Sequence, residues 1–112
     1  METKEKLLRQ YLVKFAEDQQ AEWLKALEFT IGFKDFNDFC FALLVGRKVI
    51  LNSDYEADEL FSSLVHELWH LRQKEKSVIR YYLFKMFWFR HKIEDSAEEW
   101  EAIAEDWIYF NR

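Results

Sequence analysis

The sequence contains no proline, two glycines and a single cysteine, and each shortage narrows the class of protein. A chain that lacks proline and is 33% charged suits long solvent-exposed helices and argues against disordered tails. Cys40 has no second cysteine with which to form an intramolecular disulfide, and its neighbours Phe39 and Phe41 indicate a buried thiol. The cysteine usage therefore favours a reducing compartment.

Long apolar runs and an excess of positive charge are also absent. No uninterrupted apolar stretch reaches the roughly 18 residues of a membrane span, and residues 1–6 lack the apolar segment of a secretory signal. The net charge of −5 provides no overall basic field for a phosphate backbone. We therefore expect a soluble, cytoplasmic protein with no membrane span and no nucleic-acid partner.

Aromatic side chains are abundant instead, with 11 Phe, 5 Trp and 5 Tyr among 112 residues. A hydrophobic content of 50% is enough for one compact core, and the length is too short for two ordinary domains. We expect residues 1–112 to form a single domain with many aromatic rings in its core. For so small a core, a monomer and a homodimer are equally compatible with the sequence.

The order of apolar and polar residues predicts an α+β fold with about four helices and a small antiparallel sheet of two or three strands. Residues 3–27 repeat apolar side chains at near-helical spacing among charges, which predicts an amphipathic helix. Short segments with β-branched and aromatic residues predict strands at 29–33, 39–45 and 48–52. Gly46-Arg47 is expected to turn a hairpin between the last two strands.

Three further helices are expected after the strands. Ser53 and Glu56 match the spacing of a capping box, which predicts the start of a second helix. Residues 78–90 are apolar on nearly every side and predict a third helix, which is central in the fold or covered by a partner. A fourth helix is expected over about 95–110.

Five consecutive residues carry the strongest functional signal: His66-Glu67-Leu68-Trp69-His70. Positions i and i+4 stand one above the other in a helix, so the two imidazoles can converge on one tetrahedral Zn²⁺ at about 2.0–2.1 Å. Glu67 lies one step round the helix, from where its carboxylate can take a proton from a zinc-activated water. This pattern predicts His66 and His70 as metal ligands and Glu67 as general base. The alternative is that all three are ordinary structural or surface side chains.

A catalytic zinc needs a third protein ligand, and the last predicted helix offers several carboxylates. We take its apolar face to consist of Trp100, Ile103, Ala104 and Trp107. Glu98, Glu101 and Glu105 then lie opposite this face, whereas Glu99 flanks the core. Glu99 also fits a capping box, which is its structural alternative. The other candidates for the third ligand are His91, Glu98 and Glu101.

These motifs resemble the gluzincin metallopeptidases, in which a helix with H-E-x-x-H is followed by a second helix that donates a glutamate. In that family a small residue usually follows the glutamate at the third position, and the run E-W-E-A that begins at Glu99 fits. The resemblance therefore implies Glu99 as the third ligand. Ile103 departs from the acidic or amide residue that the family has at the fourth position, and Asp106 is the candidate to replace it in orienting a ligand histidine.

The length is similar to that of the minigluzincins, minimal gluzincins that resemble the catalytic domains of membrane-integrated metallopeptidases. The resemblance implies a zincin-like fold with one zinc ion per chain and endopeptidase activity on a peptide or protein substrate. It also implies that the strand before the motif helix, here residues 49–52, binds an extended peptide by strand addition. Latency imposed by the C-terminal segment is known in the family, so residues 107–112 are a candidate self-blocking tail of a zymogen. The candidates for stabilising the reaction intermediate are Tyr81, Tyr82, Tyr109 and His91.

Two other classes of protein fit the same residues. A non-catalytic, zinc-stabilised interaction module would hold the ion with four protein ligands and use residues 78–89 as an apolar partner surface. A helix-rich structural protein would bind no metal at all, and its histidines would be incidental. Metal content separates the last class from the other two.

Overall fold

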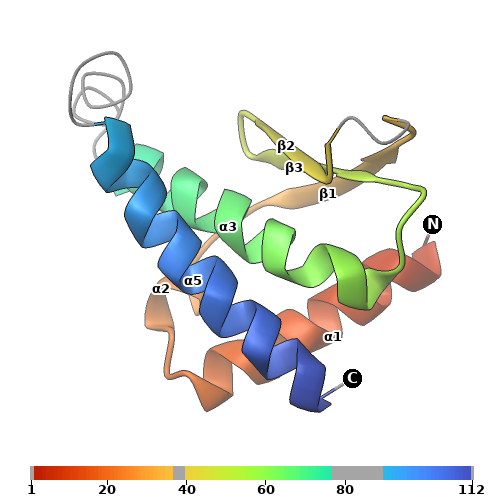
Figure 1. Cartoon of the computed structure of the whole chain (residues 1–112), viewed down its shortest axis with the longest axis horizontal. Coiled ribbons are helices and arrows are strands. Elements are labelled where there is room, and N and C mark those ends of the chain that lie inside the picture. Colours follow the sequence, from red (N-terminus) through yellow and green to blue (C-terminus); the bar gives the residue numbers. More distant parts are fainter. Residues whose placement is uncertain (1, 37–39, 77–89, 112) are drawn as a thin grey trace.

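The computed structural model describes residues 2–36, 40–76 and 90–111, with side chains described for 3–36, 40–75 and 96–111. Four helices and three strands are present in these residues (Figure 1). They are α1 (Glu2–Asp18), α2 (Glu22–Lys25), β1 (Thr30–Lys34), β2 (Ala42–Val45), β3 (Lys48–Asn52), α3 (Ala57–Lys76) and α5 (Arg90–Asn111). The predicted α+β class is confirmed. The helix expected at 78–90 lies outside the described residues, except for its last position, where α5 begins.

The first helix ends earlier than the sequence predicts. Gln20 adopts a left-handed conformation with φ of 53°. The amide of Ala21 donates to the carbonyl of Ala16 at 2.9 Å and that of Gln20 to Glu17 at 3.2 Å. This pair of bonds ends a helix when one residue turns left-handed, a position that glycine or asparagine usually occupies. The single helix expected over 3–27 is therefore wrong, because a glutamine at the turn gives no sequence signal for it.

The three strands form one mixed sheet in the order β1-β3-β2. The predicted hairpin of β2 and β3 is confirmed, and Gly46 in its turn has φ of 62°, which glycine adopts without strain. β1 instead runs parallel to β3, with Ile31 opposite Val49. The expected antiparallel sheet is therefore correct for only one of the two pairings.

The strand β3 ends at a buried asparagine that organises the following turn. Asn52 is 0% exposed, and its Nδ2 donates to the carbonyl of Cys40 at 2.8 Å. Its Oδ1 accepts from the amide of Asp54 at 3.0 Å, which is an Asx turn. Cys40 itself is half-buried rather than fully buried.

The helix with the histidine motif starts three residues later than the capping box of Ser53 and Glu56 predicts. The carboxylate of Glu59 accepts from the amide of Glu56 at 3.2 Å, so Glu56 stands at the N-terminus and α3 begins at Ala57. The reach-back contact of a capping box is present, but between different residues. The shift leaves the histidine motif in the middle of α3.

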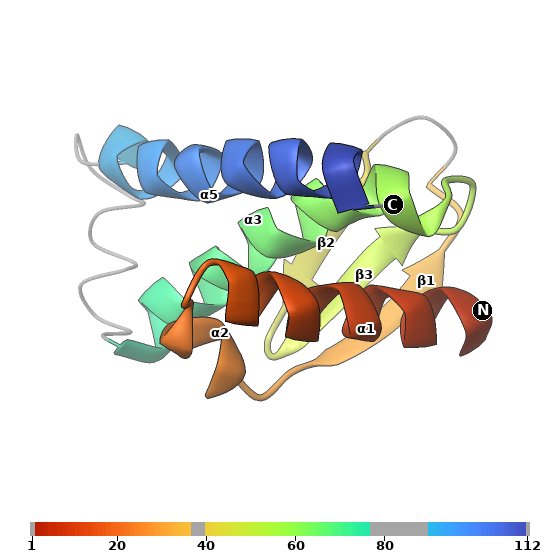
Figure 2. The same cartoon turned by 90° about the horizontal axis from the view of Figure 1, so that it is seen from below.

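α3 is the central element of the molecule. Figure 2 shows α5 and α1 on two sides of it, and the sheet packs against it as well. Aromatic rings join the three helices: Phe15 and Phe61 are 0% exposed and lie 5.4 Å apart, edge to face. Trp107 of α5 lies 5.3 Å from Phe61 and 5.4 Å from Phe15. Each such pair contributes about 0.5–1.5 kcal/mol beyond its burial, so these rings fix α1 and α5 on α3.

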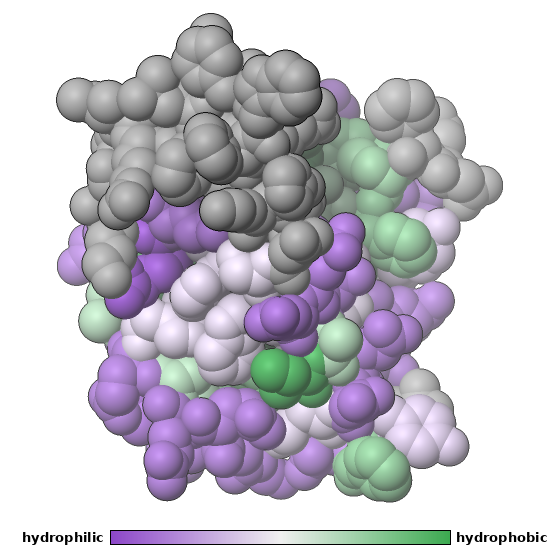
Figure 3. Space-filling view, turned by 60° about the vertical axis from the view of Figure 1, so that its left-hand side comes forward, coloured by the Kyte–Doolittle hydropathy of each residue, from purple (hydrophilic) through white to green (hydrophobic). Residues whose placement is uncertain are grey.

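Polar residues cover much of the described part of one face of the molecule (Figure 3). Figure 3 shows a face on which polar residues surround small separate hydrophobic patches. The exposed large apolar residues are Leu7, Val13, Phe41, Leu43, Val45, Ile103, Tyr109 and Phe110. Among the described residues, no helix combines the length and the apolar character that crossing a membrane requires.

Candidate metal centre

The two histidines of the motif face one another on the side of α3 that meets α5. His70 is 5% exposed and the side chain of His66 is 16% exposed, so both rings are largely out of water. Their ring centroids are 4.8 Å apart, and 3.1 Å separates the two Nε2 atoms. The structure therefore brings together the two ligands that the i, i+4 spacing predicted.

Each imidazole is held at its other nitrogen by an oxygen. Nδ1 of His66 is buried and lies 2.7 Å from Oε1 of Glu101, within ion-pair distance but outside hydrogen-bond geometry. Nδ1 of His70 lies 3.1 Å from Oε1 of Gln73. Because an amide oxygen only accepts, Nδ1 of His70 donates to Gln73 and the Nε2 of the neutral ring presents a lone pair toward His66. The two Nε2 atoms lie 3.1 Å apart, a separation that either a shared proton or a metal cation between them accounts for.

Glu101 reaches His66 because the inward face of α5 is shifted from the face that the sequence predicts. Among the described side chains of α5, the buried ones are Ala97, Ala104, Trp107 and Ile108, and Trp100 packs against the core. Ile103 is 38% exposed, and Glu98 and Glu99 are exposed as well. The predicted face is therefore correct for Trp100, Ala104 and Trp107 and wrong for Ile103. Glu101, expected opposite that face, contacts His66 with a side chain that is 38% exposed, and hydrophobicity alone does not reveal this contact.

α5 also begins earlier than expected, at Arg90 rather than near 95 or 96. Glu99 therefore lies well inside the helix. A capping box requires a helix N-terminus, so its alternative role as a cap partner is excluded.

The third ligand is not assembled in the described part of the chain. Among these residues, no three His, Cys, Asp or Glu side chains converge into a metal-binding group. Glu98 and Glu99 are exposed, and Glu101 contacts the outer nitrogen of His66. The side chain of His91 lies outside the described residues. Glu99 as the third ligand stays a prediction.

The residues predicted to act in catalysis lie apart from one another. Glu67 is partly buried in the same turn of α3 as the histidine pair. Tyr109 is 65% exposed, near the C-terminal end of α5, and Asp106 is exposed one turn before that end. Tyr81 and Tyr82 lie outside the described residues. Of the groups that the structure describes, only Glu67 shares a helical turn with the histidines.

Two polar residues near the site were missed in the sequence. Gln73 contacts His70 from three positions further along α3, a spacing at which helix side chains meet, so this signal was present. Ser96 accepts hydrogen bonds from Trp69 Nε1 at 2.8 Å and from Gln73 Nε2 at 3.0 Å. No local pattern predicts these two bonds, since they depend on how α5 packs on α3.

Three tryptophans lie together at the motif. Trp69, between the histidines, lies 4.9 Å from Trp23 and 5.9 Å from Trp100. Trp23 and Trp100 are themselves 5.3 Å apart. The site therefore lies beside a rigid aromatic cluster contributed by α2, α3 and α5.

The strand expected to bind a peptide cannot do so by strand addition. β3, which contains residues 49–52, lies between β1 and β2 and pairs with both. Its backbone groups are therefore already used on both sides. β2 is an edge strand of the described sheet, it packs against α3, and its Leu43 and Val45 are 47% and 54% exposed.

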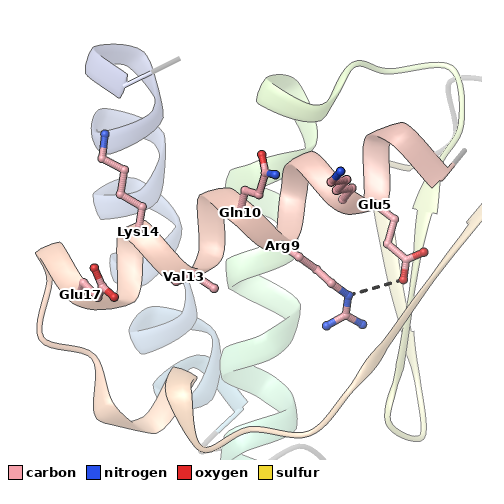
Figure 4. A pocket seen from close by; sticks show the side chains of 7 residues that line it. Glu5, Arg9, Gln10, Val13, Lys14 and Glu17 are labelled. Atoms are coloured by element: carbon pink, nitrogen blue, oxygen red, sulfur yellow. Dashed lines mark ion pairs between the residues drawn. The ribbon is translucent and has the colours of Figure 1, made fainter.

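A large hollow in the described structure lies away from the histidines. It has a volume of about 690 Å³ and is lined by one face of α1 (Figure 4). The lining residues are Glu5, Lys6, Arg9, Gln10, Val13, Lys14 and Glu17. Ligand sites usually enclose most of a ligand between several elements. A hollow lined by a single helix face does not, so the histidine pair remains the candidate site.

Comparison of the chain with protein-family models, with curated proteins and with solved structures gives no match. The functional interpretation therefore depends on the site itself.

Proposed function

We propose that the chain is a zinc metallopeptidase in which His66 and His70 are two of the metal ligands. The observation that carries this proposal is the 3.1 Å separation of their Nε2 atoms. Two nitrogens at about 2.0–2.1 Å from a tetrahedral zinc ion lie about 3.3 Å apart. The opposite nitrogens lie against oxygens of Glu101 and Gln73, so in the neutral rings with Nδ1 protonated both Nε2 atoms are free to bind a cation. The donor chemistry therefore fits a zinc ion.

Glu67 is the proposed general base. A zinc ion held by His66 and His70 would supply a water ligand with a pKa of about 7 and a Lewis acid for a peptide carbonyl. The carboxylate of Glu67 would accept a proton from water as its oxygen bonds to the carbonyl carbon, and would return that proton to the amine nitrogen as the C–N bond breaks. Glu99 belongs to the proposal as the third ligand, because the run E-W-E-A that begins there resembles the gluzincin pattern.

The proposed substrate is an extended peptide that adds to the open edge of β2. β2 has one neighbour in the described sheet, so its outer backbone groups can pair with an added strand. Leu43 and Val45 alternate along it and are exposed. This arrangement favours a peptide with apolar side chains at alternate positions.

Latency through the C-terminal segment is a further part of the proposal. Trp107 is 7% exposed, belongs to the core and donates from Nε1 to Asp18 at 2.8 Å. Tyr109 and Phe110 are 65% and 81% exposed, so they are the residues of this segment that can cover a site. Deletion of residues 107–112 would remove Trp107 and so disturb the hydrophobic core. The double substitution Tyr109→Ala and Phe110→Ala is the cleaner test, and unchanged peptidase activity would exclude a blocking role for these rings.

Location and assembly remain proposals as well. A cytoplasmic location is favoured by the single cysteine, which forms no intramolecular disulfide. A homodimer is compatible with the small core, and light scattering in solution distinguishes it from a monomer.

A non-catalytic zinc module is the second candidate function. Its supporting observation is the burial of His70, which is 5% exposed, since structural zinc sites are closed. In such a module zinc would stabilise the fold, and Glu67 would have no chemical role. Residues 78–89, its expected partner surface, lie outside the described residues.

Metal content and one substitution test the proposal. Protein purified without a metal-affinity tag should contain one zinc ion per chain by elemental analysis. Glu67→Gln should keep this zinc and lower the cleavage rate of a quenched fluorescent peptide library about 10²- to 10⁴-fold. Glu105→Gln, an exposed carboxylate on α5, is the matched control and should change neither. Bound zinc without cleavage by the wild-type protein would favour the module, and absence of zinc would exclude both functions.

A further inference from the structure

Polar contacts between α3 and α5 converge on one serine. Oγ of Ser96 accepts from the indole of Trp69 at 2.8 Å and from Nε2 of Gln73 at 3.0 Å. Oε1 of the same Gln73 lies 3.1 Å from Nδ1 of His70. A continuous chain of hydrogen bonds therefore runs from α5 through Gln73 to the second histidine of the motif.

The orientation of the Gln73 amide gives these bonds their direction. Its Nε2 donates to Oγ of Ser96, which also accepts from the indole N–H of Trp69. With the nitrogen of the amide on Ser96, its oxygen faces Nδ1 of His70 and accepts from it. The Nε2 of the neutral His70 ring is then left as the nitrogen that faces His66.

We propose that Ser96 is a positioning residue for the metal centre, which acts on His70 through Gln73. This role rests on the proposed zinc site. A hydrogen-bond partner on the far side of a ligand histidine, here called an outer partner, fixes the orientation and the tautomer of its ring. The histidine then binds the ion more tightly, because the correct orientation and tautomer are already present before binding. α5 thus supports both histidines, directly through Glu101 and indirectly through Ser96.

Zinc affinity measures this role without any assay of turnover. We expect Ser96→Ala to weaken Zn²⁺ binding about 10- to 100-fold, the usual loss on removal of an outer partner, in competition with a chromophoric chelator. The visible spectrum of the Co²⁺-loaded protein should change as well, since it reports the ligand geometry. Ser96→Thr keeps the hydroxyl and should restore both properties. Ser53→Ala, which removes a hydroxyl before α3, is the matched control and should behave as wild type.

A second pair of variants separates positioning from helix packing. Trp69→Phe removes a bond to Ser96 and part of the tryptophan cluster, so it should lower the unfolding midpoint of the metal-free protein. It leaves the contact of Gln73 with Ser96 in place, so zinc affinity should persist. Gln73→Leu should weaken zinc binding as Ser96→Ala does. The double variant Gln73→Leu/Ser96→Ala should bind zinc as weakly as Gln73→Leu alone, because both substitutions break the same chain of hydrogen bonds.

The outcomes are distinguishable. Wild-type zinc affinity in Ser96→Ala would overturn the positioning role and leave the proposed function intact. Equal losses of affinity in Trp69→Phe and Ser96→Ala would also overturn it, since helix packing would then explain both. A wild-type protein that binds no zinc would overturn the proposed function itself.

Discussion

The two halves of α5 contact α3 in different ways. Toward its C-terminus, α5 buries Ala104, Trp107 and Ile108 against the aromatic core around Phe61. Toward its N-terminus, the contact of Trp100 with Trp69 is accompanied by polar contacts, which include that of Glu101 with His66. One helix therefore combines, on a single neighbour, an apolar half and a half in which polar contacts join the aromatic ones, here called the polar half.

The two kinds of contact have different roles: the apolar contacts stabilise the fold, and the polar contacts serve the candidate site. Burying apolar rings stabilises a fold, whereas a partly buried charge gains little over an apolar replacement and often costs stability. The presence of polar groups at a helix interface therefore needs an explanation other than stability of the fold. Here they hold the histidine pair, which is the only candidate chemistry that the sequence and the described structure share.

The largest expected effect is on the apolar half. Phe61→Ala should lower the free energy of unfolding by about 3–5 kcal/mol, because it removes a fully buried ring from the core. Urea unfolding of the metal-free protein measures this loss. Zinc affinity of the folded variant should be unchanged. Val13→Ala, at a position that is 63% exposed, is the control and should stay within about 0.5 kcal/mol of wild type. A large loss of zinc affinity in folded Phe61→Ala would contradict the claim that the apolar contacts affect stability and not zinc binding.

The polar half should respond in the opposite way. Glu101→Leu should weaken zinc binding about 10- to 100-fold, through loss of the outer partner of His66, with little loss of stability in the metal-free protein. Chelator competition and urea unfolding measure the two quantities. Glu101→Gln keeps an acceptor for Nδ1 and should retain most of the affinity. If Glu101→Gln abolished zinc binding as well, Glu101 would be a direct ligand and not an outer partner.

The smallest effect is expected at the far end of α3, where the hairpin turn meets the helix. Arg47 and Glu75 form an ion pair at 2.8 Å with side chains 49% and 42% exposed. The hydrogen bond to Glu75 raises the pKa of Arg47, which is charged at every working pH with or without it, so no pH dependence should follow. Arg47→Gln should lower the urea midpoint only slightly, and less at high salt, because water and ions screen exposed pairs. An effect as large as that of Phe61→Ala would contradict this ranking.

The sequence pattern predicted those parts of the fold that depend on residues close together in the chain. The strand at 48–52 has the predicted bounds, and Gly46 turns the hairpin. The two motif histidines meet because the 3.6-residue period of a helix requires it. The parallel neighbour of β3 and the break at Gln20 depend on tertiary packing and on an unusual left-handed residue, so they were missed.

The candidate site was only partly predictable for a related reason. Hydrophobicity placed Ile103 inside and Glu101 outside, whereas both are 38% exposed and Glu101 contacts His66. A carboxylate can lie at the interface because a histidine of the neighbouring helix contacts it. The hydrophobic pattern of one helix contains no information about that neighbour. Ser96 was missed for the same reason, since its partners lie on α3.

The central claim is that the facing nitrogens of His66 and His70 hold a zinc ion. Anomalous diffraction at the zinc edge, from crystals of protein purified without a metal-affinity tag, tests it most directly. We predict one peak per chain at about 2.0–2.1 Å from both Nε2 atoms, with the third ligand visible in the same map. Crystals of zinc-supplemented protein with no peak at the histidine pair would contradict it.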